Sequence, residues 1–394
     1  MPESKLSQFF LMKELKFLST GSWRQGRIWT CEKLRTGAEV CPRCATPSTC
    51  RYGVAYTNVR DEVVRGQPIL LRIRKHRYLC KVCRKPFTEA VPGILPRRRT
   101  TQRLRKQMLL DCEQFTNLSQ VAHRHYFSKS FVHRLFYEQM ELRLRERVGQ
   151  RWPQVVGIDE HFFSRSKGFT EFTTVFTDIG RRKMFEMAES KNKSSLLEQV
   201  GQIEGRQNVT LAVMDLSRGY HALAKELFPN ARIVADKFHV LRLLTPALIR
   251  VRRQIHGHRQ ELHLRRKLLM NRGRLEYFQR CEVDRYLNQH PELKELYHFK
   301  ERLHQLYRTK GYVRAGQALQ NLLLEMERST QPDVVRLRAT LKAWSPEILE
   351  YFRSRFTNAF TEAMNGIAKL VQRRGCGYRN FKNYRLRTLN ACPL

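Results

Sequence analysis

Short apolar runs that end on an acidic residue dominate the middle of the chain. Three of these runs, at residues 155–163, 211–215 and 232–236, carry Asp159, Asp215 and Asp236. Runs rich in Val, Ile, Phe and Thr and bounded by Gly indicate β-strands. A single Asp at such a place is commonly the cap of the next helix. Three core strands with the same ending indicate a site at one edge of a sheet, where solvent and metal ions have access.

The order of the elements predicts a mixed α+β domain. The expected strands lie near 155–163, 170–179, 182–189, 210–215 and 232–236, and the expected helices at 193–202 and 217–228. The first three strands form an antiparallel meander, and strand and helix alternate after them. This is the order of a ribonuclease-H-like fold.

Helical periodicity continues through the last third of the chain. Residues 246–350 are too long for a loop and are predicted to be a helical insertion. The next helix, within 351–373, has a predicted buried stripe of Phe360, Ala363, Met364, Ile367 and Leu370. A second row on this helix holds Glu362, Asn365, Gly366 and Lys369, and its Gly leaves space for a ligand beside Glu362. Taken alone, this row is more typical of an ordinary exposed Glu–Lys helix face.

The charge of the chain indicates what kind of molecule the protein binds. There are 74 Lys and Arg against 36 Asp and Glu in 394 residues, a formal net charge of +38. Such an excess, spread from end to end, predicts a polyanionic partner. No apolar run approaches the roughly 20 residues that span a bilayer, and no signal peptide is visible. We therefore expect no membrane partner and a cytoplasmic, nucleoid-associated protein.

Two Cys-x-x-Cys pairs near the N-terminus predict a structural zinc site. Four thiolates, from Cys41, Cys44, Cys80 and Cys83, suit the tetrahedral coordination of one Zn²⁺. The interval between the pairs contains strand-like segments that would fold back and bring the pairs together. Cys31 and Cys50 lie close enough in sequence to replace a ligand, and a redox pair or free thiols are the alternative to zinc.

A basic linker and a helical segment follow the cysteines. Arg97, Arg98 and Arg99 stand beside Pro and Gly and are expected to track phosphates. Residues 118–135 fit a helix-turn-helix, with Ser128 capping a second helix. The side chains expected to face a DNA major groove are those of Lys129, Ser130, His133 and Arg134. Any helical hairpin has similar spacing, so this assignment is a hypothesis.

The C-terminal tail combines basic and aromatic residues. Its arginines Arg373, Arg374 and Arg379 are predicted to bind DNA, and the interleaved aromatics to stack on bases.

Together these features resemble a DDE transposase of bacterial insertion sequences, most closely the ISL-three family. The resemblance rests on the segments 157–160, 214–217, 234–239, 358–366 and 374–381, with the paired cysteines and the helix-turn-helix. It implies a ribonuclease-H-like catalytic domain with the acid triad Asp159, Asp215 and Glu362. It also implies supporting roles for Asp236, His239 and Lys369, with the insertion lying between the second and third acids.

The family's chemistry implies the cofactors and partners. Attack on a phosphodiester builds charge on the entering and leaving oxygens, and two Mg²⁺ ions held by the triad stabilise both. We therefore expect two catalytic Mg²⁺, one structural Zn²⁺, double-stranded DNA as transposon ends and target, and a homodimer on paired ends. The predicted segments are a zinc-binding domain (1–92), a helix-turn-helix domain (97–150), the catalytic domain (151–245), the insertion (246–350) and the last helix with its tail (351–394).

Two other functions fit parts of the sequence. A DNA-binding regulator with an inactive catalytic sheet would not need the acid triad. A structure-specific nuclease of the same fold would not need two separate sequence-reading modules. The expected function is a transposase that cleaves DNA and transfers the 3′-OH ends.

Overall fold

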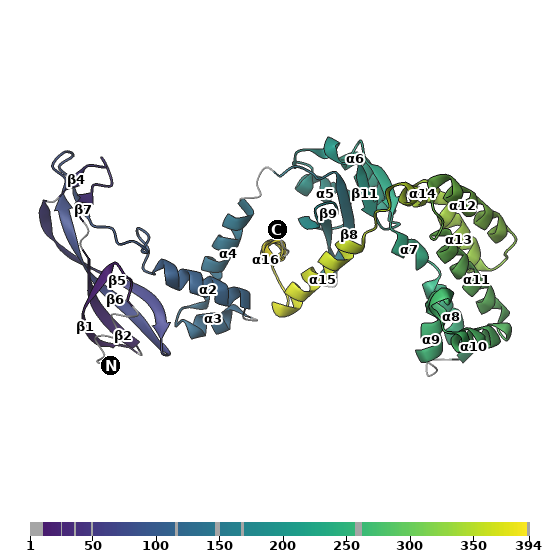
Figure 1. Ribbon diagram of the computed structural model, residues 1–394, viewed down its shortest axis with the longest axis horizontal. Coiled ribbons are helices and arrows are strands. Elements are labelled where there is room, and N and C mark those ends of the chain that lie inside the picture. Colours follow the sequence, from purple (N-terminus) through teal and green to yellow (C-terminus); the bar gives the residue numbers. More distant parts are fainter. Residues whose placement is uncertain are drawn as a thin grey trace. The chain divides into compact units, whose positions relative to one another are not determined.

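The computed structural model describes residues 11–24, 26–34, 37–48, 50–114, 117–145, 150–166, 169–256 and 262–391. The chain forms two compact units, Met1–Leu142 and Arg143–Leu394. Both units are drawn in Figure 1. The five predicted segments divide the chain more finely than these two units and remain predictions. Among the helices of the described ranges, none is long and apolar enough to cross a bilayer.

A five-stranded sheet forms the base of the first unit. Its strands are β1 (Leu15–Trp23), β2 (Gly26–Lys33), β5 (Arg51–Val64), β6 (Gln67–Leu79) and β7 (Pro86–Thr88). The order is β1-β2-β6-β5, with β7 also paired to β6, and the β2–β6 pair is parallel. Ile69, Leu71 and Ile73 alternate along β6 and are all buried, because alternate side chains of a strand share one face. Their face forms a core with Leu15 and Trp29.

Three helices complete the first unit: α2 (Gln102–Gln114), α3 (Leu118–Arg124) and α4 (Lys129–Arg145). Asn117 caps α3 by accepting a hydrogen bond from the Gln120 amide at 3.0 Å. The predicted cap Ser128 accepts from the Phe131 amide at 3.3 Å at the start of α4. Apolar residues at helical spacing, Val121, Ala122, Val132 and Leu135, are buried between the helices.

A buried acid fastens α2 to the sheet. Asp61 of β5 is 2% exposed, and its Oδ1 accepts hydrogen bonds from Thr101 Oγ1 at 2.7 Å and Arg103 Nε at 2.9 Å. Next to it, the Arg60 guanidinium lies over the rings of Trp23 and Phe127. The buried carboxylate of Asp61 needs its hydrogen bonds from Thr101 and Arg103 to offset the cost of desolvation. The sheet and the helices of this unit are therefore held together by specific contacts.

The second unit contains the predicted acid-bearing sheet. Its order is β10-β9-β8-β11-β12, for strands β8 (Val155–Ser166), β9 (Phe169–Asp178), β10 (Lys183–Glu189), β11 (Leu211–Met214) and β12 (Arg232–Ala235). β8, β9 and β10 are antiparallel, whereas β11 is parallel to both β8 and β12. The mixed α+β class, the antiparallel meander and the later strands that alternate with helices agree with the prediction.

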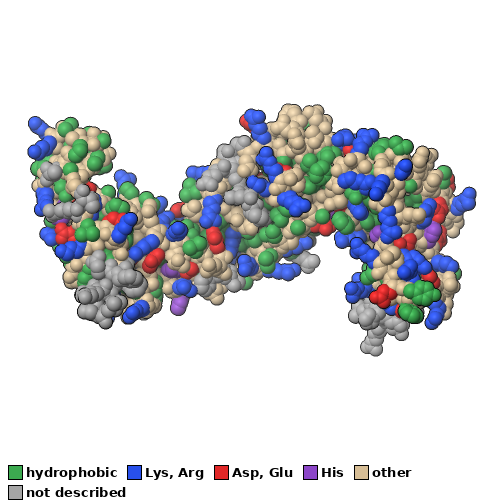
Figure 2. Space-filling model, viewed as in Figure 1, with side chains coloured by type: hydrophobic (Ala, Val, Ile, Leu, Met, Phe, Trp, Pro, Cys, Tyr) green, Lys and Arg blue, Asp and Glu red, His purple; other side chains and the backbone are tan. Residues whose placement is uncertain are grey.

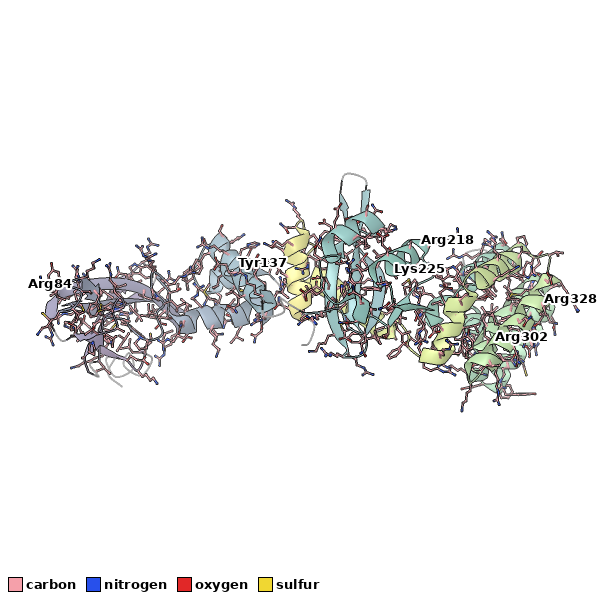
Figure 3. All side chains as sticks on the ribbon, turned by 90° about the horizontal axis from the view of Figure 1, so that it is seen from above. Arg84, Tyr137, Arg218, Lys225, Arg302 and Arg328 are labelled. Carbon is pink, nitrogen blue, oxygen red and sulfur yellow. The ribbon has the colours of Figure 1, made fainter. Side chains whose placement is uncertain are left out.

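Helices cover both faces of this sheet (Figure 1). α5 (Lys193–Val200) and α6 (Arg218–Leu227) pack on the face that carries Val156 and Ile158. The polar side of α6 faces outward, with Arg218 and Lys225 projecting from the sheet (Figure 3). α15 (Ala359–Arg374) and α16 (Phe381–Ala391) pack on the opposite face, against Phe163 and Val175.

The predicted buried stripe of α15 is only partly right. The buried residues are Thr361, Met364, Asn365, Ala368 and Val371, whereas Leu370 is 52% exposed and Ala363 is also exposed. Part of the helix faces a polar strip of β8 and β9, so Thr361 and Asn365 are buried in hydrogen bonds. A prediction from the spacing of apolar residues alone leaves out these two polar residues and therefore places part of the buried face on the wrong side of the helix.

The described residues of the predicted insertion form helices joined by short turns, with no strand among them. The α-helices are α8 (Thr245–His256), α9 (Leu262–Leu269), α10 (Tyr277–Asn288), α11 (Pro291–Leu306), α12 (Tyr312–Glu327), α13 (Pro332–Ala343) and α14 (Ser345–Ser354). The short α7 (Lys237–Leu241) leads into it from β12 (Figure 1). One apolar core joins the insertion to β11 and β12. Lys and Arg side chains are spread over both units (Figure 2), in keeping with the net charge.

Candidate active site and zinc-binding cluster

The acidic residues gather across β8, β11 and β12, close to the start of α15. Asp159 lies within β8, Asp215 directly follows β11, and Asp236 directly follows β12. β11 is parallel to both β8 and β12, and its last residue, Met214, pairs with Ile158 and with Ala235. The acid that follows each of these paired residues therefore lies at the same level of the sheet, although β8 itself continues to Ser166. The structure thus brings the three predicted strand acids to one region.

His239 joins two of these acids. Its Nδ1 lies 2.8 Å from Asp215 Oδ1 and 3.0 Å from Asp236 Oδ2. The ion pair with Asp215, and then the hydrogen bond and charge of Asp236, raise the pKa of His239 to about 10, so that it is a cation at neutral pH. Nδ1 carries one hydrogen, which Asp236 Oδ2 accepts. Asp215 Oδ1 is consequently buried without a hydrogen bond of its own.

Asp236 is the structural acid of the group. It is fully buried, and its Oδ2 also accepts hydrogen bonds from the Phe238 and His239 amides, as the cap of α7. Its Oδ1 accepts from the Asn358 amide at 2.8 Å. Burial alone would raise the pKa of Asp236, but the bonds from His239 and Asn358 outweigh it and lower that pKa. Asp236 therefore ties the start of α15 to the end of β12.

Burial and a neighbouring carboxylate both act against the charge of Asp159. Asp159 is 8% exposed; its Oδ1 accepts from the Glu160 amide at 2.8 Å and its Oδ2 from Asn365 Nδ2 at 2.7 Å. Burial, and then repulsion by Asp215, raise the pKa of Asp159 to about 6. The charged form of this carboxylate is thus disfavoured in the absence of a metal ion. A bound cation would stabilise that charge. The neighbouring Glu160 points to the other face, where it accepts from the Tyr220 hydroxyl.

A buried polar relay fixes the amide that holds Asp159. Asn365 Oδ1 lies 3.3 Å from His161 Nδ1, and His161 Nε2 lies 2.6 Å from the Tyr384 hydroxyl. Burial lowers the pKa of His161 to about 4, so the ring is neutral. A neutral ring that accepts from Tyr384 donates through Nδ1 to Asn365. The Asn365 amide nitrogen must then face Asp159.

Glu362 and Lys369 lie on the same helix as Asn365. Glu362 is one turn before Asn365 and forms an ion pair with Arg242, at 3.8 Å between Oε1 and Nη1. Lys369 is exposed one turn after Asn365. Gly366 has open space where a side chain would begin, as expected for a helix face that a ligand approaches. Within the described residues, Asp215, Asp236 and His239 have potential metal-ligating atoms that lie within 4.8 Å of one another. Asp159 and Glu362 do not belong to this group.

Sequence reasoning missed several residues that build this site. Asn358, His161 and Arg242 have no role in the sequence prediction, Tyr384 is placed there among the aromatics that stack on bases, and Asn365 is only part of a helical row. The signal for His161 was available, because alternation places residue 161 on the face of β8 that carries Asp159. Tyr384 and Arg242 could not be found this way, since their contacts depend on how separate elements pack.

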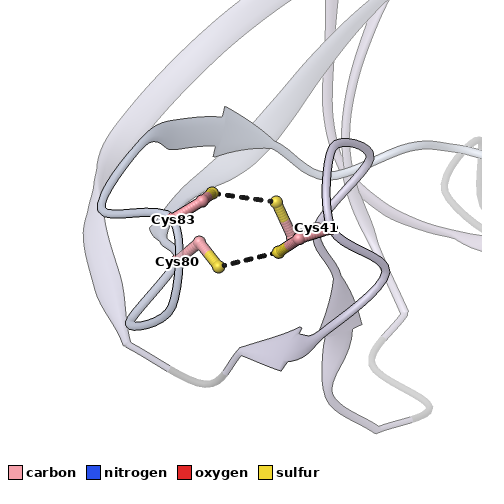
Figure 4. Close-up of side chains that lie close together, drawn as sticks. Cys41, Cys80 and Cys83 are labelled. Atoms are coloured by element: carbon pink, nitrogen blue, oxygen red, sulfur yellow. Dashed lines mark hydrogen bonds between the residues drawn. The ribbon is translucent and has the colours of Figure 1, made fainter.

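The second predicted cluster lies in the first unit and contains Cys41, Cys44, Cys80 and Cys83. One pair lies between the short strands β3 (Glu39–Val40) and β4 (Pro47–Ser48), and the other between β6 and β7. The Sγ atoms of Cys41 and Cys83 are 3.7 Å apart, and those of Cys44 and Cys80 are 3.4 Å apart (Figure 4). Tetrahedral Zn²⁺ with bonds of about 2.3 Å separates sulfurs by about 3.8 Å. The four thiols therefore fit a structural zinc ion.

The two cysteine pairs have matching backbones. The residue after each pair, Ala45 or Arg84, has a positive φ of 57° or 53°. The amide of each first cysteine donates to a carbonyl five residues later. Backbone hydrogen bonds lower the pKa of Cys41, and those of Thr46 lower the pKa of Cys44 to about 6, which favours the thiolate that a metal requires.

The alternative zinc ligands lie elsewhere. Cys31 is buried in β2, and burial raises its pKa to about 12, as expected of a packed thiol. Cys50 is half-buried and lies outside the group of four.

The predicted DNA-binding residues are exposed. This holds for Arg97, Arg98 and Arg99 of the linker, for Lys129, Ser130, His133 and Arg134 of α4, and for Arg373, Arg374 and Arg379. The aromatic part of the tail prediction is wrong for Tyr384, which is fully buried, and Phe381 packs edge-on against Phe163. Tyr384 fills the core under α15 and is not available to stack on bases, whereas Phe381 is half-buried against the same core.

Comparison with known proteins agrees with this arrangement. A family model described as transposase, of the ISL3 type of DDE enzymes, matches residues 156–388. A second model, described as the zinc-finger of the transposases of IS204, IS1001, IS1096 and IS1165, matches residues 38–83. The chain belongs to the ISL3 family of DDE transposases, which confirms the resemblance found in the sequence.

A curated relative is similar over almost the whole chain. It is the transposase for insertion sequence element IS1001 of Bordetella parapertussis, with 24% identity over 365 residues. The match covers 90% of this chain and 89% of the relative. The match to the zinc-finger family model contains all four clustered cysteines. The match to the transposase family model contains every acid of the candidate active site.

Proposed function

We propose that this protein is a DDE transposase that binds the ends of its insertion sequence, cleaves DNA phosphodiesters and transfers the 3′-OH ends to target DNA. The observation that carries the proposal is the gathering of Asp159 and Asp215 at one sheet edge, beneath the helix that bears Glu362. The strand order β10-β9-β8-β11-β12 supports the assignment of a ribonuclease-H-like catalytic domain.

The donor set suits Mg²⁺. This ion prefers oxygen ligands and retains several waters, so a few carboxylates suffice. Asp215 Oδ1 is buried without a hydrogen bond, and Asp159 has a raised pKa because of burial and of Asp215. Two Mg²⁺ ions held by Asp159, Asp215 and Glu362 would activate the entering oxygen and stabilise the leaving 3′ oxygen.

The protein's other groups position these acids. Asn365 fixes one oxygen of Asp159, and His239 holds Asp215 beside the buried Asp236. Arg242 pairs with Glu362 and supplies positive charge at the mouth of the site. The Lys369 ammonium, on the same helix, would face the phosphates of bound DNA. We assign Asp236 and His239 to the architecture of the site.

DNA binding is proposed for the remaining modules. α4 would read the transposon end through Lys129, Ser130, His133 and Arg134, as the second helix of a helix-turn-helix. The linker arginines, with Arg373, Arg374 and Arg379, would hold phosphates. Pairing of two ends would require two chains, so we propose a homodimer on paired ends.

The test is a set of single substitutions of the acids. Asp159→Ala, Asp215→Ala and Glu362→Ala should each lower cleavage and strand transfer by at least about 10³-fold while end binding stays within a few-fold, because a two-metal site fails without any one of its ligands. Asp236→Ala and His239→Ala should cause smaller losses. The wild type should need Mg²⁺ or Mn²⁺, and Ca²⁺ should support binding without chemistry.

Two outcomes would favour the other functions. Cleavage of uncut ends without any joined product on pre-cut ends would indicate a nuclease. End binding without metal-dependent cleavage would indicate a regulator. Near-normal cleavage by the Glu362→Ala protein would show that the third acid is misassigned.

A further inference from the structure

A basic pocket lies in the second unit, between α7 and the helical insertion. Its volume is about 390 Å³, which is in the range of small-ligand pockets. Six basic or imidazole side chains line it, those of Lys237, Arg242, Arg274, Lys300, His304 and Arg308. No Asp or Glu belongs to its described lining. A concave site with this charge attracts an anion.

Some of these groups are already engaged. The buried Lys300 ammonium donates to the carbonyls of Leu268 and Met270, each at 2.7 Å, and pairs with Glu301, so it is structural. Arg308 donates to Asn271 at 2.7 Å. Arg274 is exposed and forms no ion pair with any described acid. Arg274 and Arg308 are thus the guanidinium groups most open to an added anion.

The pKa of the half-buried His304 shows the effect of the positive charges that surround the pocket. Burial lowers the pKa of His304; nearby Glu301 opposes this, and the charges of Lys300, Arg308 and Lys237 lower it further. The pocket is therefore positive even though its histidine is neutral at pH 7. Charge-assisted hydrogen bonds from arginine to phosphate are among the stronger polar contacts available to such a site.

The pocket adjoins the candidate active site through α7. Arg242, at the end of α7, lines the pocket and pairs with Glu362 at 3.8 Å. Lys237 lines the pocket and directly follows Asp236. Phe238, on the same helix, is 36% exposed and also lines the pocket. An aromatic face beside basic groups is typical of surfaces that bind nucleic-acid strands.

We propose that this pocket binds one backbone phosphate of the DNA strand that occupies the active site, with the attached nucleotide against Phe238. The proposal rests on the proposed function, since it takes the DNA to be the substrate of the acids. Arg274 and Arg308 hold the phosphate, and they are positioning residues. The pocket fixes where the strand crosses the acids and so contributes to the choice of the cleaved bond.

The test neutralises the phosphate and its partners in turn. Duplexes that carry the element's end and its flank are prepared with a single neutral methylphosphonate at each position around the cleavage site. At one position the substitution should weaken binding to the wild type by about 10- to 100-fold, the size expected for a charged hydrogen-bonded contact. The protein with both Arg274→Gln and Arg308→Gln should be insensitive at that position and sensitive at the others.

A matched control protein carries Arg314→Gln and Arg328→Gln. Both are exposed arginines of the insertion outside the pocket, and Arg328 is labelled in Figure 3. The control should keep the wild-type pattern at every position. Equal sensitivity of the pocket variant and the control at all positions would overturn the proposal. Inorganic phosphate should compete only weakly with DNA, and strong competition that leaves the methylphosphonate pattern flat would indicate a free-phosphate site instead.

Cleavage by the wild type separates this proposal from the proposed function. If the wild type cleaves with Mg²⁺ and the pocket variant cleaves at the same rate and the same bond, the pocket assignment is wrong and the function stands. If the wild type does not cleave any end, the proposed function is wrong. The pocket variant should cleave at least about tenfold more slowly at low DNA concentration.

Discussion

At the scale of single residues, Asp159 shows how the fold prepares for a cation. The side chain is buried beside a second carboxylate, and its pKa is raised to about 6 by burial and by Asp215. Two neutral donors, the Glu160 amide and Asn365, hold it without neutralising its charge. The protein thus keeps a carboxylate where its ionised form costs free energy in the absence of metal.

The pH dependence of stability should reveal this cost. The folded-state pKa of Asp159 is raised, so between pH 3.8 and about 6 the folded protein holds a proton that the unfolded chain releases. The free energy of unfolding therefore falls as pH rises through this window, by about 3 kcal/mol in all. In Mg²⁺-free buffer, Asp159→Asn should gain most of that amount, about 2.4 kcal/mol, relative to the wild type between pH 4 and pH 7.

Hydrogen exchange of peptides from β8, corrected for intrinsic rates, measures this difference. The Asn side chain forgoes part of its hydrogen bonding at every pH, so the change in the difference is the informative quantity. A constant difference between pH 4 and pH 7 would show that Asp159 titrates normally.

At the scale of elements, one glycine sets the distance between α15 and the sheet. A Cβ on Gly157 would lie 2.1 Å from Thr361 Oγ1 and 2.5 Å from Thr177 Oγ1. These two hydroxyls are hydrogen-bonded to each other at 2.7 Å. Asn358 adds a bond from its Nδ2 to the Ile158 carbonyl at 3.0 Å. The helix that bears Glu362 is therefore seated by polar contacts with β8 and β9.

Gly157→Ala should consequently destabilise the second unit by about 1–3 kcal/mol and lower cleavage, because overpacking separates the helix from the sheet. Gly366→Ala is the matched control on the helix itself. Its Cβ would meet nothing within 4 Å, so it should be neutral or stabilise by about 0.5–1 kcal/mol. Urea unfolding of both proteins decides, and equal stabilities would contradict the close seating of α15.

The same helix shows what the sequence could and could not predict. The strands, the meander and the place of each strand acid followed from apolar runs and from strand alternation. Strand alternation also places Glu160 on the face opposite to Asp159, since alternate residues face opposite sides. The face of α15 did not, because its contact with the sheet is polar and includes Thr361 and Asn365. Burial of Tyr384 depended on a hydrogen bond to His161, which no local pattern encodes.

The zinc cluster yields a prediction at the same scale. Cys80→Ser should reduce the zinc content from about one ion per chain to a small fraction and unfold the cysteine-bearing strands, because a structural zinc site contributes folding free energy. Cys281→Ser is the control, since Cys281 is exposed on α10. Metal analysis of the purified proteins measures both. Full zinc content in the Cys80→Ser protein would exclude the four-cysteine site.

At the scale of the whole molecule, the basic residues behind the net charge of +38 have two possible roles in DNA binding. Some would contact phosphates, and others would read the base sequence. The exposed linker arginines and the exposed residues of α4 are the candidates for these two tasks. Phosphate contacts release counterions and act on all DNA alike, whereas base contacts carry sequence preference. Binding measured against salt concentration separates the two.

Replacing Arg97, Arg98 and Arg99 by Gln should weaken binding to end and scrambled duplexes equally. The slope of log K against log salt should become less steep by about 0.9 for each phosphate that the protein no longer neutralises, or about 2.7 for all three. Replacing Lys129, Ser130, His133 and Arg134 by Ala should instead lower the ratio of end to scrambled affinity, by about 5- to 150-fold for each base that is no longer read. If that ratio is unchanged, the reading surface is not α4, and the zinc-binding part of the first unit becomes the candidate, because Arg72 and Arg77 lie on β6 beside its second cysteine pair.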